Sequence, residues 1–510
     1  MIKDLSGVGS IDANVDYAII GAGTVGVLIA SELTKKGYNV LALESGGIIQ
    51  ESETNELNEV VYKKSKYESS KTGRFRCLGG TSSRWGGAML PNLSKDIELG
   101  NWPITSEEII KHLKKVEDLF KLPNNSYKNP FINFKKDSNF ISRLAKLPSF
   151  KNRNIFNIFK KEITRKNGPS VWVNATVTKF KVNNQKLEQV IAENIDGSSI
   201  AVKSKKFIFT SGAIETTRLM LLLNQQNNNC ISNITNKLGT NFSDHISIPV
   251  AEIEIKNKKK LNELFAYYFD INKTMKSMRL ELDENSPLRE IIPPFFGRVV
   301  ISNTSGGYEN LREIFRILQK RKVPSLKNLL KLTKELPWIL KAIWWKIYKK
   351  TLLFPKKPDL EMNIVIEQVS DPSNKITLSM DKNDVFKQPL AEINWSVSES
   401  DSKNIFNATY AIQEFWNTSS LSKIGDFKLK DTRKINELIK NADGIHHPSG
   451  TTRMSNDKQN GVVDKNLQLF SLENTGIIST SVFPTGGGSN PTMTLFMLAY
   501  RYIDRIKKKY

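Results

Sequence analysis

The hydrophobic pattern of the chain opens with two short apolar runs on either side of a helical pattern. The run Asp16-Tyr17-Ala18-Ile19-Ile20 leads into Gly21-Ala22-Gly23-Thr24-Val25-Gly26, and apolar residues then recur at helical spacing as far as Gly37. A second run, Val40-Leu41-Ala42-Leu43, ends at Glu44. This order predicts a strand, a glycine-rich turn, a helix and a second strand, which together form a βαβ unit of a parallel sheet.

The middle of the chain has a different pattern, in which apolar and polar residues alternate. Between residues 246 and about 397, alternation recurs at 250–255, 278–282, 298–301 and 362–366. Period-two alternation is typical of an antiparallel sheet with one solvated face. We therefore expect a second domain that is inserted into the first.

The other segments connect these two patterns. Residues 95–166 are mixed and are expected to be mostly helical, and 171–177 and the alternating stretches after it are expected to be strands. The buried run Lys206-Phe207-Ile208-Phe209-Thr210 is followed by Ser211-Gly212-Ala213 and a helical pattern. Gly-Ala between a strand and a helix predicts a second close approach to a ligand of the first domain.

The glycine-rich turn is typical of a dinucleotide site. Gly21 would allow the tight turn, Gly23 the close approach of a pyrophosphate, and Gly26 the packing of helix on strand. The helix N-terminus would face the phosphates, and Glu44 lies where a carboxylate binds ribose hydroxyls. The alternative interpretation is that these glycines only form a tight turn.

Composition indicates an ordinary soluble globular protein of two to four domains. The chain has 510 residues, and its two cysteines, Cys77 and Cys230, form no CxxC pair. Neither a disulfide framework nor a zinc site is therefore indicated, and we expect no metal. The N-terminal residues lack the pattern of a signal peptide, and no apolar run reaches the roughly 18 residues of a membrane span. We expect a cytoplasmic protein.

The net charge of +23 is concentrated in one segment. Residues 311–358 contain fourteen Lys or Arg against Glu313 and Glu335. Pro324 and Pro337 would divide the segment into one or two basic amphipathic helices. Either their apolar face packs on their own domain, or it docks at the surface of an anionic membrane or on a partner protein. The apolar residues concerned are Leu329, Leu330, Leu332, Trp338, Ile339, Leu340, Ile343, Trp344, Trp345, Ile347 and Tyr348.

Two further motifs bear on chemistry. The stretch 78–87 is so rich in glycine that we expect a loop close to a ligand. The C-terminal part contains His446-His447-Pro448-Ser449-Gly450-Thr451-Thr452-Arg453-Met454 and, later, Ser489-Asn490-Pro491-Thr492. Two of the four histidines of the chain are thus adjacent.

Four separated segments, in the right order, resemble the glucose-methanol-choline (GMC) family of flavin-dependent alcohol oxidoreductases. They are the opening glycine motif with Glu44-Ser45-Gly46, the loop Gly79-Gly80-Thr81-Ser82, the strand Asn174-Ala175-Thr176-Val177, and the block from His447 to Met454 with Asn490-Pro491-Thr492. The last block is more similar to the sugar-oxidising bacterial branch than to the aryl-alcohol or choline branches.

The resemblance implies a Rossmann-like FAD-binding domain of the α/β class and a substrate domain built on an antiparallel sheet. The FAD domain would comprise residues 1–95, 166–245 and 436–510, with cap and substrate elements at 96–165 and the substrate domain at 246–435. The residues expected to contact FAD are Gly21, Gly23, Gly26, Glu44, Gly79, Gly80, Thr81, Ser82, Val177, Gly212, Ser481 and Val482.

The resemblance also implies that an alcohol or sugar CH–OH group is oxidised to a carbonyl, with hydride transfer to flavin N5. An alcohol has a pKa near 16 and imidazole one near 6.5. Full deprotonation before hydride loss is therefore unfavourable by roughly nine pK units. His447 can act as the base only if proton and hydride leave together or if the alkoxide is stabilised. Asn490 would supply that stabilisation by donating its amide N–H.

We expect none of the other three histidines to act as the base. His446 is expected to be a packing or substrate-side neighbour. His245 is expected to be structural, because Asp-His at a strand start usually satisfies backbone groups. His112 lies in a charged helical pattern and is expected to be solvated.

Arg84 stands where some sugar-oxidising relatives carry a histidine that binds FAD covalently. The flavin is therefore expected to be non-covalent, and Arg84 would face it, contact phosphate or form a structural salt bridge. Two alternatives are a nicotinamide-dependent reductase and a membrane- or partner-docking protein that keeps FAD as a structural ligand. We expect no nucleic acid partner, and the sequence leaves open the electron acceptor, whether oxygen, a quinone or a protein.

Overall fold

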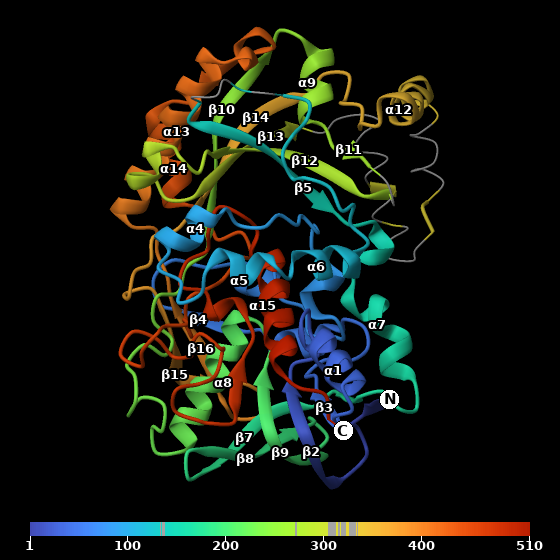
Figure 1. Cartoon of the computed structure of the whole chain (residues 1–510), viewed down its shortest axis with the longest axis vertical. Coiled ribbons are helices and arrows are strands. Elements are labelled where there is room, and N and C mark those ends of the chain that lie inside the picture. The colour runs from blue at the N-terminus through green and yellow to red at the C-terminus, as the bar shows by residue number, and fades with distance from the viewer. Residues whose placement is uncertain are drawn as a thin grey trace.

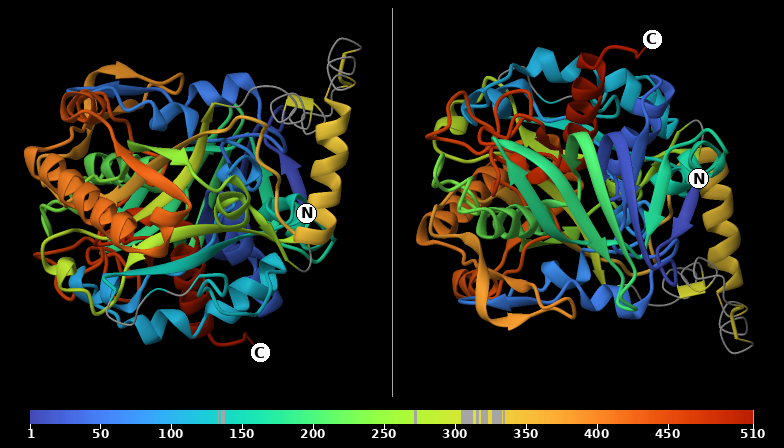
Figure 2. Two further views of the ribbon diagram at one scale, coloured as in Figure 1. Left: turned by 90° about the horizontal axis from the view of Figure 1, so that it is seen from above. Right: turned by 90° about the horizontal axis from the view of Figure 1, so that it is seen from below.

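The computed structural model describes residues 1–132, 134, 138–270, 273–303, 313, 314, 317, 323–325, 333 and 335–509. Two sheets lie at opposite ends of the long axis of the molecule, with the C-terminal helix and several shorter helices between them (Figure 1). The two views along that axis show the sheet strands fanned by their twist (Figure 2). The chain passes between the two sheets several times, so that neither half is continuous in sequence.

The first sheet is mostly parallel and has the order β1-β6-β3-β2-β9-β8-β7, with β18 also paired to β9. Within the described residues its strands are β1 (Ile2–Asp4), β2 (Ser10–Ile20), β3 (Val40–Leu43), β6 (Ser170–Val173), β7 (Thr176–Asn183), β8 (Lys186–Glu193), β9 (Ser199–Phe209) and β18 (Thr475–Ile477). All four residues of β3 are buried, as expected for an apolar run that is covered on both faces.

Helices cover this sheet and fill the space towards the second one. They are α1 (Gly26–Lys35), α2 (Ser52–Glu56), α3 (Ser69–Thr72), α4 (Ser94–Leu99), α5 (Ser106–Ile110), α6 (Leu113–Phe120), α7 (Ile155–Thr164), α8 (Ala213–Gln226) and α15 (Pro491–Arg505). The helix α15 is buried along most of its length and packs on α1, α5 and α6.

The second sheet is antiparallel and has the order β11-β12-β13-β14-β10-β17, with β5 paired to β12. Its strands are β5 (Phe140–Leu147), β10 (His245–Ile255), β11 (Tyr268–Phe269), β12 (Met275–Leu282), β13 (Phe295–Asn303), β14 (Asp359–Glu367) and β17 (Gly425–Leu429). The remaining helices are α9 (Lys258–Phe265), α12 (Leu336–Lys349), α13 (Glu399–Thr418) and α14 (Thr432–Lys440). Apolar residues of one sheet face join Ile405 and Ile412 of α13 in a second core. The opposite face of this sheet is turned towards the candidate active site. The predicted α/β class with an antiparallel second sheet is confirmed.

A third, small sheet consists of β4 (Val60–Tyr62), β15 (Lys375–Asn383) and β16 (Pro389–Asn394). It packs on α8 rather than on the second sheet.

Two details differ from the expectations for residues 95–166. The strand β5 interrupts the expected helical segment, because its antiparallel pairing with β12, far away in sequence, determines its conformation. His112 is buried rather than solvated, with 3% of its surface exposed. Its Nδ1 lies 3.1 Å from the carboxylate of Asp504 on α15, and burial lowers its pKa. The helix packing turns this polar residue inwards.

The described part of the basic segment is the helix α12. Pro337 lies in its first turn, and Leu329, Leu330 and Leu332 lie outside the described residues. Trp338 and Trp345 pack with Leu353. The opposite face exposes Leu336, Leu340, Ile343, Trp344, Ile347 and Tyr348, each 51–68% exposed. The face with Trp338 and Trp345 fits the interpretation that the segment packs on its own domain. The exposed face fits the interpretation that it docks on a membrane or a partner protein. Within the described residues, no helix has the length and apolar character of a bilayer span.

Candidate active site

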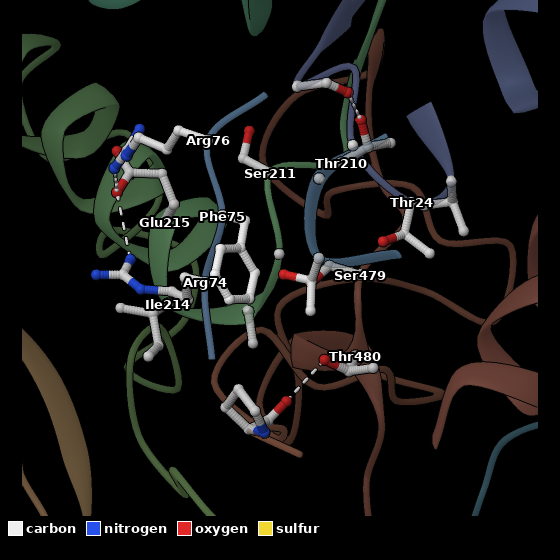
Figure 3. Close-up of a pocket in the computed structure, with 18 of the residues that line it drawn as sticks. Thr24, Arg74, Phe75, Arg76, Thr210, Ser211, Ile214, Glu215, Ser479 and Thr480 are labelled. Atoms are coloured by element: carbon white, nitrogen blue, oxygen red, sulfur yellow. Dashed lines mark hydrogen bonds and ion pairs between the residues drawn. The ribbon is translucent and has the colours of Figure 1, made fainter. Parts of the chain in front are cut away.

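A large cavity opens at the carboxyl ends of β2, β3 and β9 and reaches the N-terminus of α15 (Figure 3). Its lining combines the glycine turn, Glu44 and Ser45 with His446, His447 and Thr492 from the C-terminal part of the chain. The cavity therefore suits an extended ligand such as a dinucleotide.

The glycine turn forms one wall through backbone contacts. Gly21 has a φ of +100°, and a Cβ atom on it would lie 2.8 Å from the Ser211 hydroxyl. A Cβ on Gly80 would lie 2.9 Å from the Cα atom of Gly23. A Cβ on Gly26 would overlap the carbonyl oxygen of Gly21. Bare backbone is thus required here, as the close approach of a pyrophosphate also requires.

Glu44 lies at the tip of β3, inside the cavity. Its carboxylate oxygens accept hydrogen bonds from the backbone N–H groups of Ala22 and Gly46, both at 3.0 Å. Burial raises its pKa to about 7. Next to it, the Arg76 guanidinium donates to the Ser45 hydroxyl at 2.9 Å. This end of the cavity is held rigidly, as a ribose-binding carboxylate would need to be.

The residues predicted to contact FAD fall into two groups. The first group lines the cavity and comprises Gly21, Gly23, Glu44, Gly80, Thr81, Val177 and Gly212. The second lies directly behind the wall and comprises Gly26, Gly79, Ser82, Ser481 and Val482. These five shape the loops rather than the surface: Gly79 N–H, for example, donates to the Ala22 carbonyl at 2.9 Å, and Ser481 Oγ accepts from Thr452 at 2.7 Å.

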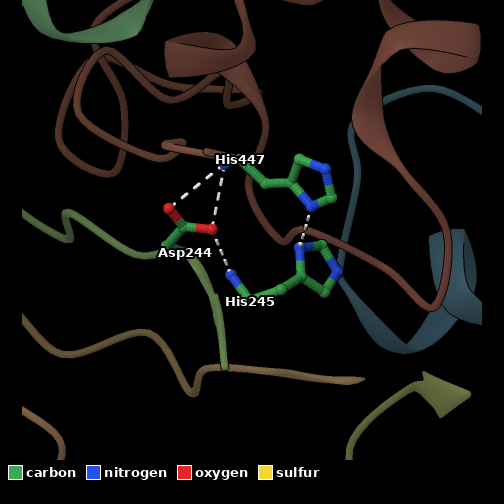
Figure 4. A group of neighbouring side chains, drawn as sticks. All are labelled: Asp244, His245 and His447. Atoms are coloured by element: carbon green, nitrogen blue, oxygen red, sulfur yellow. Dashed lines mark hydrogen bonds between the residues drawn. The ribbon is translucent and has the colours of Figure 1, made fainter. Parts of the chain in front are cut away.

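His447 also lines the cavity, and Asp244 fixes its backbone (Figure 4). The buried Asp244 carboxylate accepts from the N–H groups of His447, at 3.0 Å, and of His245, at 2.6 Å. The Tyr67 hydroxyl donates to the same carboxylate. Asp244, His245 and His447 could present ligand atoms within 4.8 Å of one another. Since the carboxylate is already engaged by these donors, we interpret the group as a hydrogen-bonded histidine pair.

The hydrogen bonds of the two histidines assign their tautomers. Burial lowers the pKa of His245 to about 4, and burial followed by the nearby His245 and Arg279 lowers the pKa of His447 well below its usual value. Both rings are therefore neutral. The Gly487 carbonyl can only accept, so His245 Nε2, 2.7 Å away, carries the proton. His245 Nδ1 is then an acceptor for His447 Nδ1–H at 3.3 Å. His447 Nε2 is left without a proton.

Asn490, directly before α15, faces this bare nitrogen. Its Nδ2 lies 2.9 Å from His447 Nε2. Arg279 of β12 donates to Asn490 Oδ1, which orients the amide with its N–H groups towards His447. A proton acceptor and an N–H donor therefore share one point in the cavity wall, which is the pair of groups that a reacting hydroxyl needs.

His245 was expected to be structural, and its Nε2 does bind the Gly487 carbonyl. The structure adds a contact that the sequence did not indicate, because the ring of His245 meets the ring of His447 edge to face. The adjacent Asp244 does satisfy backbone groups, as expected. His446 lines the cavity, is exposed and has a φ of +69°. Arg84 is exposed and does not line the cavity, and no ion pair joins it to a described residue.

Sequence reasoning missed Arg76 and Arg279. Arg76 directly precedes the glycine loop and forms a 2.7 Å ion pair with Glu215 inside the cavity wall, so its position was a usable signal. Arg279 carries no local signal, because only strand register brings it to Asn490.

Comparison with known families gives a match in the C-terminal part of the chain. Residues 370–499 match the C-terminal domain model of the GMC oxidoreductases, and this range includes both His447 and Asn490. This part of the chain therefore resembles the GMC oxidoreductases. The predicted family and its FAD cofactor are therefore confirmed, whereas the mode of FAD attachment is a separate question.

Two relatives share shorter stretches with this chain. A dehydrogenase of Armillaria gallica is 44% identical over 63 residues, which are 12% of this chain and 10% of the relative. The 2-methyl-1,2-propanediol dehydrogenase of Mycolicibacterium austroafricanum is 30% identical over 169 residues, 33% of this chain and 29% of the relative. The matches thus span less than a third of either relative.

Solved structures resemble the whole chain in fold. A formate oxidase has a TM-score of 0.58 at 14% identity, with 97% of this chain and 98% of that chain covered. Pyridoxine 4-oxidase from Mesorbium loti has a TM-score of 0.58 at 13% identity, with 96% and 98% covered. At this identity the likeness establishes the fold alone.

Proposed function

We propose that this chain binds FAD non-covalently and oxidises a CH–OH group of a sugar or another alcohol to a carbonyl. His447 would accept the hydroxyl proton, and Asn490 would donate an N–H to the same oxygen. The observation that carries the proposal is the 2.9 Å approach of Asn490 Nδ2 to the unprotonated His447 Nε2, beside the cavity that both His447 and Glu44 line.

The environment of His447 supports its role as a base. Its lowered pKa keeps the ring neutral near pH 7, and its Nδ1 proton is engaged by His245. Imidazole alone is far too weak to ionise an alcohol, so the oxygen needs stabilisation while its proton leaves. The Asn490 amide and the positive end of the α15 dipole both face this point of the cavity.

The cavity supports FAD as the partner in this reaction. When bound, the flavin would take up the hydride that leaves the carbinol carbon. The glycine turn, Thr81 and the N-terminus of α8 would hold its phosphates by backbone N–H groups, and Glu44 would bind its ribose. A nicotinamide-dependent reductase, the alternative from the sequence, would leave His447 and Asn490 unused.

The absence of histidine from residues 78–87 supports non-covalent binding. We expect acid precipitation of the protein to release all of its yellow colour into the supernatant. Flavin that stays with the precipitated chain would contradict this part of the proposal.

Anaerobic mixing with a panel of sugars and simple alcohols tests the reaction itself. At least one member of the panel should bleach the flavin absorbance in a concentration-dependent way. A flavin that can be reduced by dithionite but by no alcohol of the panel would overturn the proposed activity.

We also propose a peripheral contact between α12 and an anionic membrane surface. The exposed apolar face of this helix is flanked by Lys341 and Lys346. Such a face lies in the headgroup region of a bilayer with its lysines towards the phosphates.

A further inference from the structure

Three arginines form a row across the second sheet, on the face that meets the FAD domain. Arg143 of β5 pairs directly with Arg279 of β12. On the other side of β12, Leu280 pairs with Gly297, so that Arg298 of β13 occupies the position next to Arg279. Directly opposed residues share a face of a sheet. This face is towards the active site, because Arg279 donates to Asn490.

The charges of this row are only partly compensated. Arg143 Nη1 forms a 2.8 Å ion pair with Glu281, and its Nη2 donates to the Pro91 carbonyl at 2.7 Å. Glu281 is the single carboxylate that faces the row from β12; its Oε2 pairs with Arg143, and its charge also raises the pKa of Arg279 against the effect of burial. Arg298 forms no ion pair with any residue that the structure describes.

Among the three arginines, Arg279 is the one whose buried N–H groups lack hydrogen-bond partners within the part of the chain that the structure describes. It is only 3% exposed, and its guanidinium stacks 3.9 Å above the centre of the Phe296 ring. Its Nη2 donates to Asn490, but its buried Nε and Nη1 have no hydrogen-bond partner among the described residues. Burying polar N–H groups without partners is costly, and like charges opposite one another destabilise a sheet. Both costs would be offset by an anion bound between Arg279 and Arg298.

The position of this anion site relative to the reacting groups is also defined. Arg279 touches Asn490, and the positive charges of Arg279 and Arg298 both contribute to the lowered pKa of His447. Arg298 is exposed, so a soluble molecule can reach it. An anionic group held here would lie close to His447 and Asn490, the groups that would contact the alcohol.

We propose that the substrate is an alcohol with a carboxylate or phosphate group near the reacting CH–OH, and that Arg279 and Arg298 bind this anionic group. The inference rests on the proposed function, since it names the class of alcohol that the site accepts. Charge-assisted hydrogen bonds from guanidinium to carboxylate or phosphate are among the strongest in proteins.

Flavin reduction by matched pairs of alcohols is the first test. Lactate is compared with propane-1,2-diol, and glycerate and glycerol 3-phosphate with glycerol, under anaerobic conditions. We expect a carboxylate or phosphate member to reduce the flavin at least about tenfold faster at equal low concentration. The proposal is wrong if the neutral partners are equally fast or faster. If no alcohol reduces the flavin, the proposed function fails, and the titration below still decides whether the anion site exists.

Titration of the holoenzyme with acetate and with inorganic phosphate is independent of turnover. Binding is measured as a shift in the flavin absorbance spectrum and as an increase in the melting temperature. We expect Arg298→Gln to weaken binding of the preferred anion about 10- to 100-fold and Arg298→Lys to restore part of it. Arg433→Gln, in which an arginine that is 97% exposed on α14 is replaced, is the matched control and should change nothing.

Two results of this titration would overturn the proposal. One is that neither anion binds to the wild-type holoenzyme. The other is that Arg298→Gln slows charged and neutral alcohols equally and shifts the flavin reduction potential, which would mean that the arginines serve the cofactor alone.

Discussion

The parallel sheet meets the cavity with the ends of its strands, whereas the antiparallel sheet meets it with side chains from within its strands. At the first sheet the contacts come from backbone at Gly21, Gly23 and Gly80, and a Cβ atom added to Gly21 or Gly80 would collide with a neighbouring residue. At the second sheet they come from the side chains of His245 and Arg279. We call the backbone of the first sheet the cofactor wall, because it would contact the cofactor that such folds share. The side chains of the second sheet form the substrate wall, and substitution of these side chains can change the ligand. Variants of the two walls should therefore fail in different ways.

The largest effect is expected on the cofactor wall. Gly26→Ala places a methyl group against the Gly21 carbonyl oxygen, and overpacking of this kind costs about 1–3 kcal/mol or more. We expect the variant to lose most of its bound flavin, as measured by the ratio of flavin to protein absorbance. Gly86→Ala, in the neighbouring loop with no atom within 4 Å of the new methyl group, is the control and should keep its flavin. Full flavin content in Gly26→Ala would mean that the turn does not need bare backbone.

On the substrate wall, Asn490→Ala should retain flavin and lose rate. Removing one donor to a developing oxyanion typically costs roughly 3 kcal/mol, or about 10²- to 10³-fold in rate. Single-turnover flavin reduction with saturating alcohol measures this loss directly. A wild-type rate would exclude Asn490 from the reaction, and loss of flavin would place it on the cofactor wall instead.

His245→Phe should have a smaller effect, because it acts through His447. It removes the acceptor for His447 Nδ1–H and so frees the imidazole to adopt the wrong tautomer. We expect about a 10- to 100-fold slower flavin reduction, the range seen when a group that orients a histidine is removed.

The pH profile distinguishes this positioning role from simple damage. Because the pKa of His447 lies well below its usual value, the wild-type rate should stay constant as the pH falls through 6.5 and decrease only at lower pH. In His245→Phe the decrease should begin at higher pH, since one contribution to the lowered pKa is gone. An unchanged profile with a uniformly lower rate would indicate a structural role only.

The smallest effect is expected far from both walls, at α12. If this helix binds membranes, each lysine near anionic lipid contributes about 1 kcal/mol. Vesicles with phosphatidylglycerol should then sediment the protein at low salt, with a blue shift of tryptophan fluorescence, and Ile343→Glu should weaken the binding. Val385→Glu, at another exposed apolar position, is the control. Charges screen beyond about 8–10 Å at physiological salt, so binding should also fall as salt is added. Absence of sedimentation at low salt would contradict the membrane proposal.

The two walls also differ in how far they could be predicted from sequence. The turn at Gly21 and the acidic residue Glu44 are local signals, because the backbone conformation of a few consecutive residues makes the site. His447 and Asn490 were found through a family motif. The contact of His245 with His447 depends instead on where β10 begins relative to the C-terminal loop, and the arginine row depends on the register of β5, β12 and β13. Strand register is a long-range property that alternation alone does not specify.

The burial of His112 is a similar case. Its neighbours in sequence are charged, and the pattern around it is that of a surface helix. Only the packing of α6 against α15 brings Asp504 to its ring.

We propose that His447 takes the hydroxyl proton. The rate of flavin reduction in His447→Ala is the decisive measurement of this role. The measurement is anaerobic stopped-flow mixing of wild-type and variant holoenzyme with the alcohol that bleaches the wild-type flavin fastest. General base catalysis typically contributes about 10²- to 10⁴-fold. We therefore expect His447→Ala to keep its full flavin content and to reduce its flavin at least about 10²-fold more slowly than the wild type. Reduction of the variant flavin at the wild-type rate would contradict the claim.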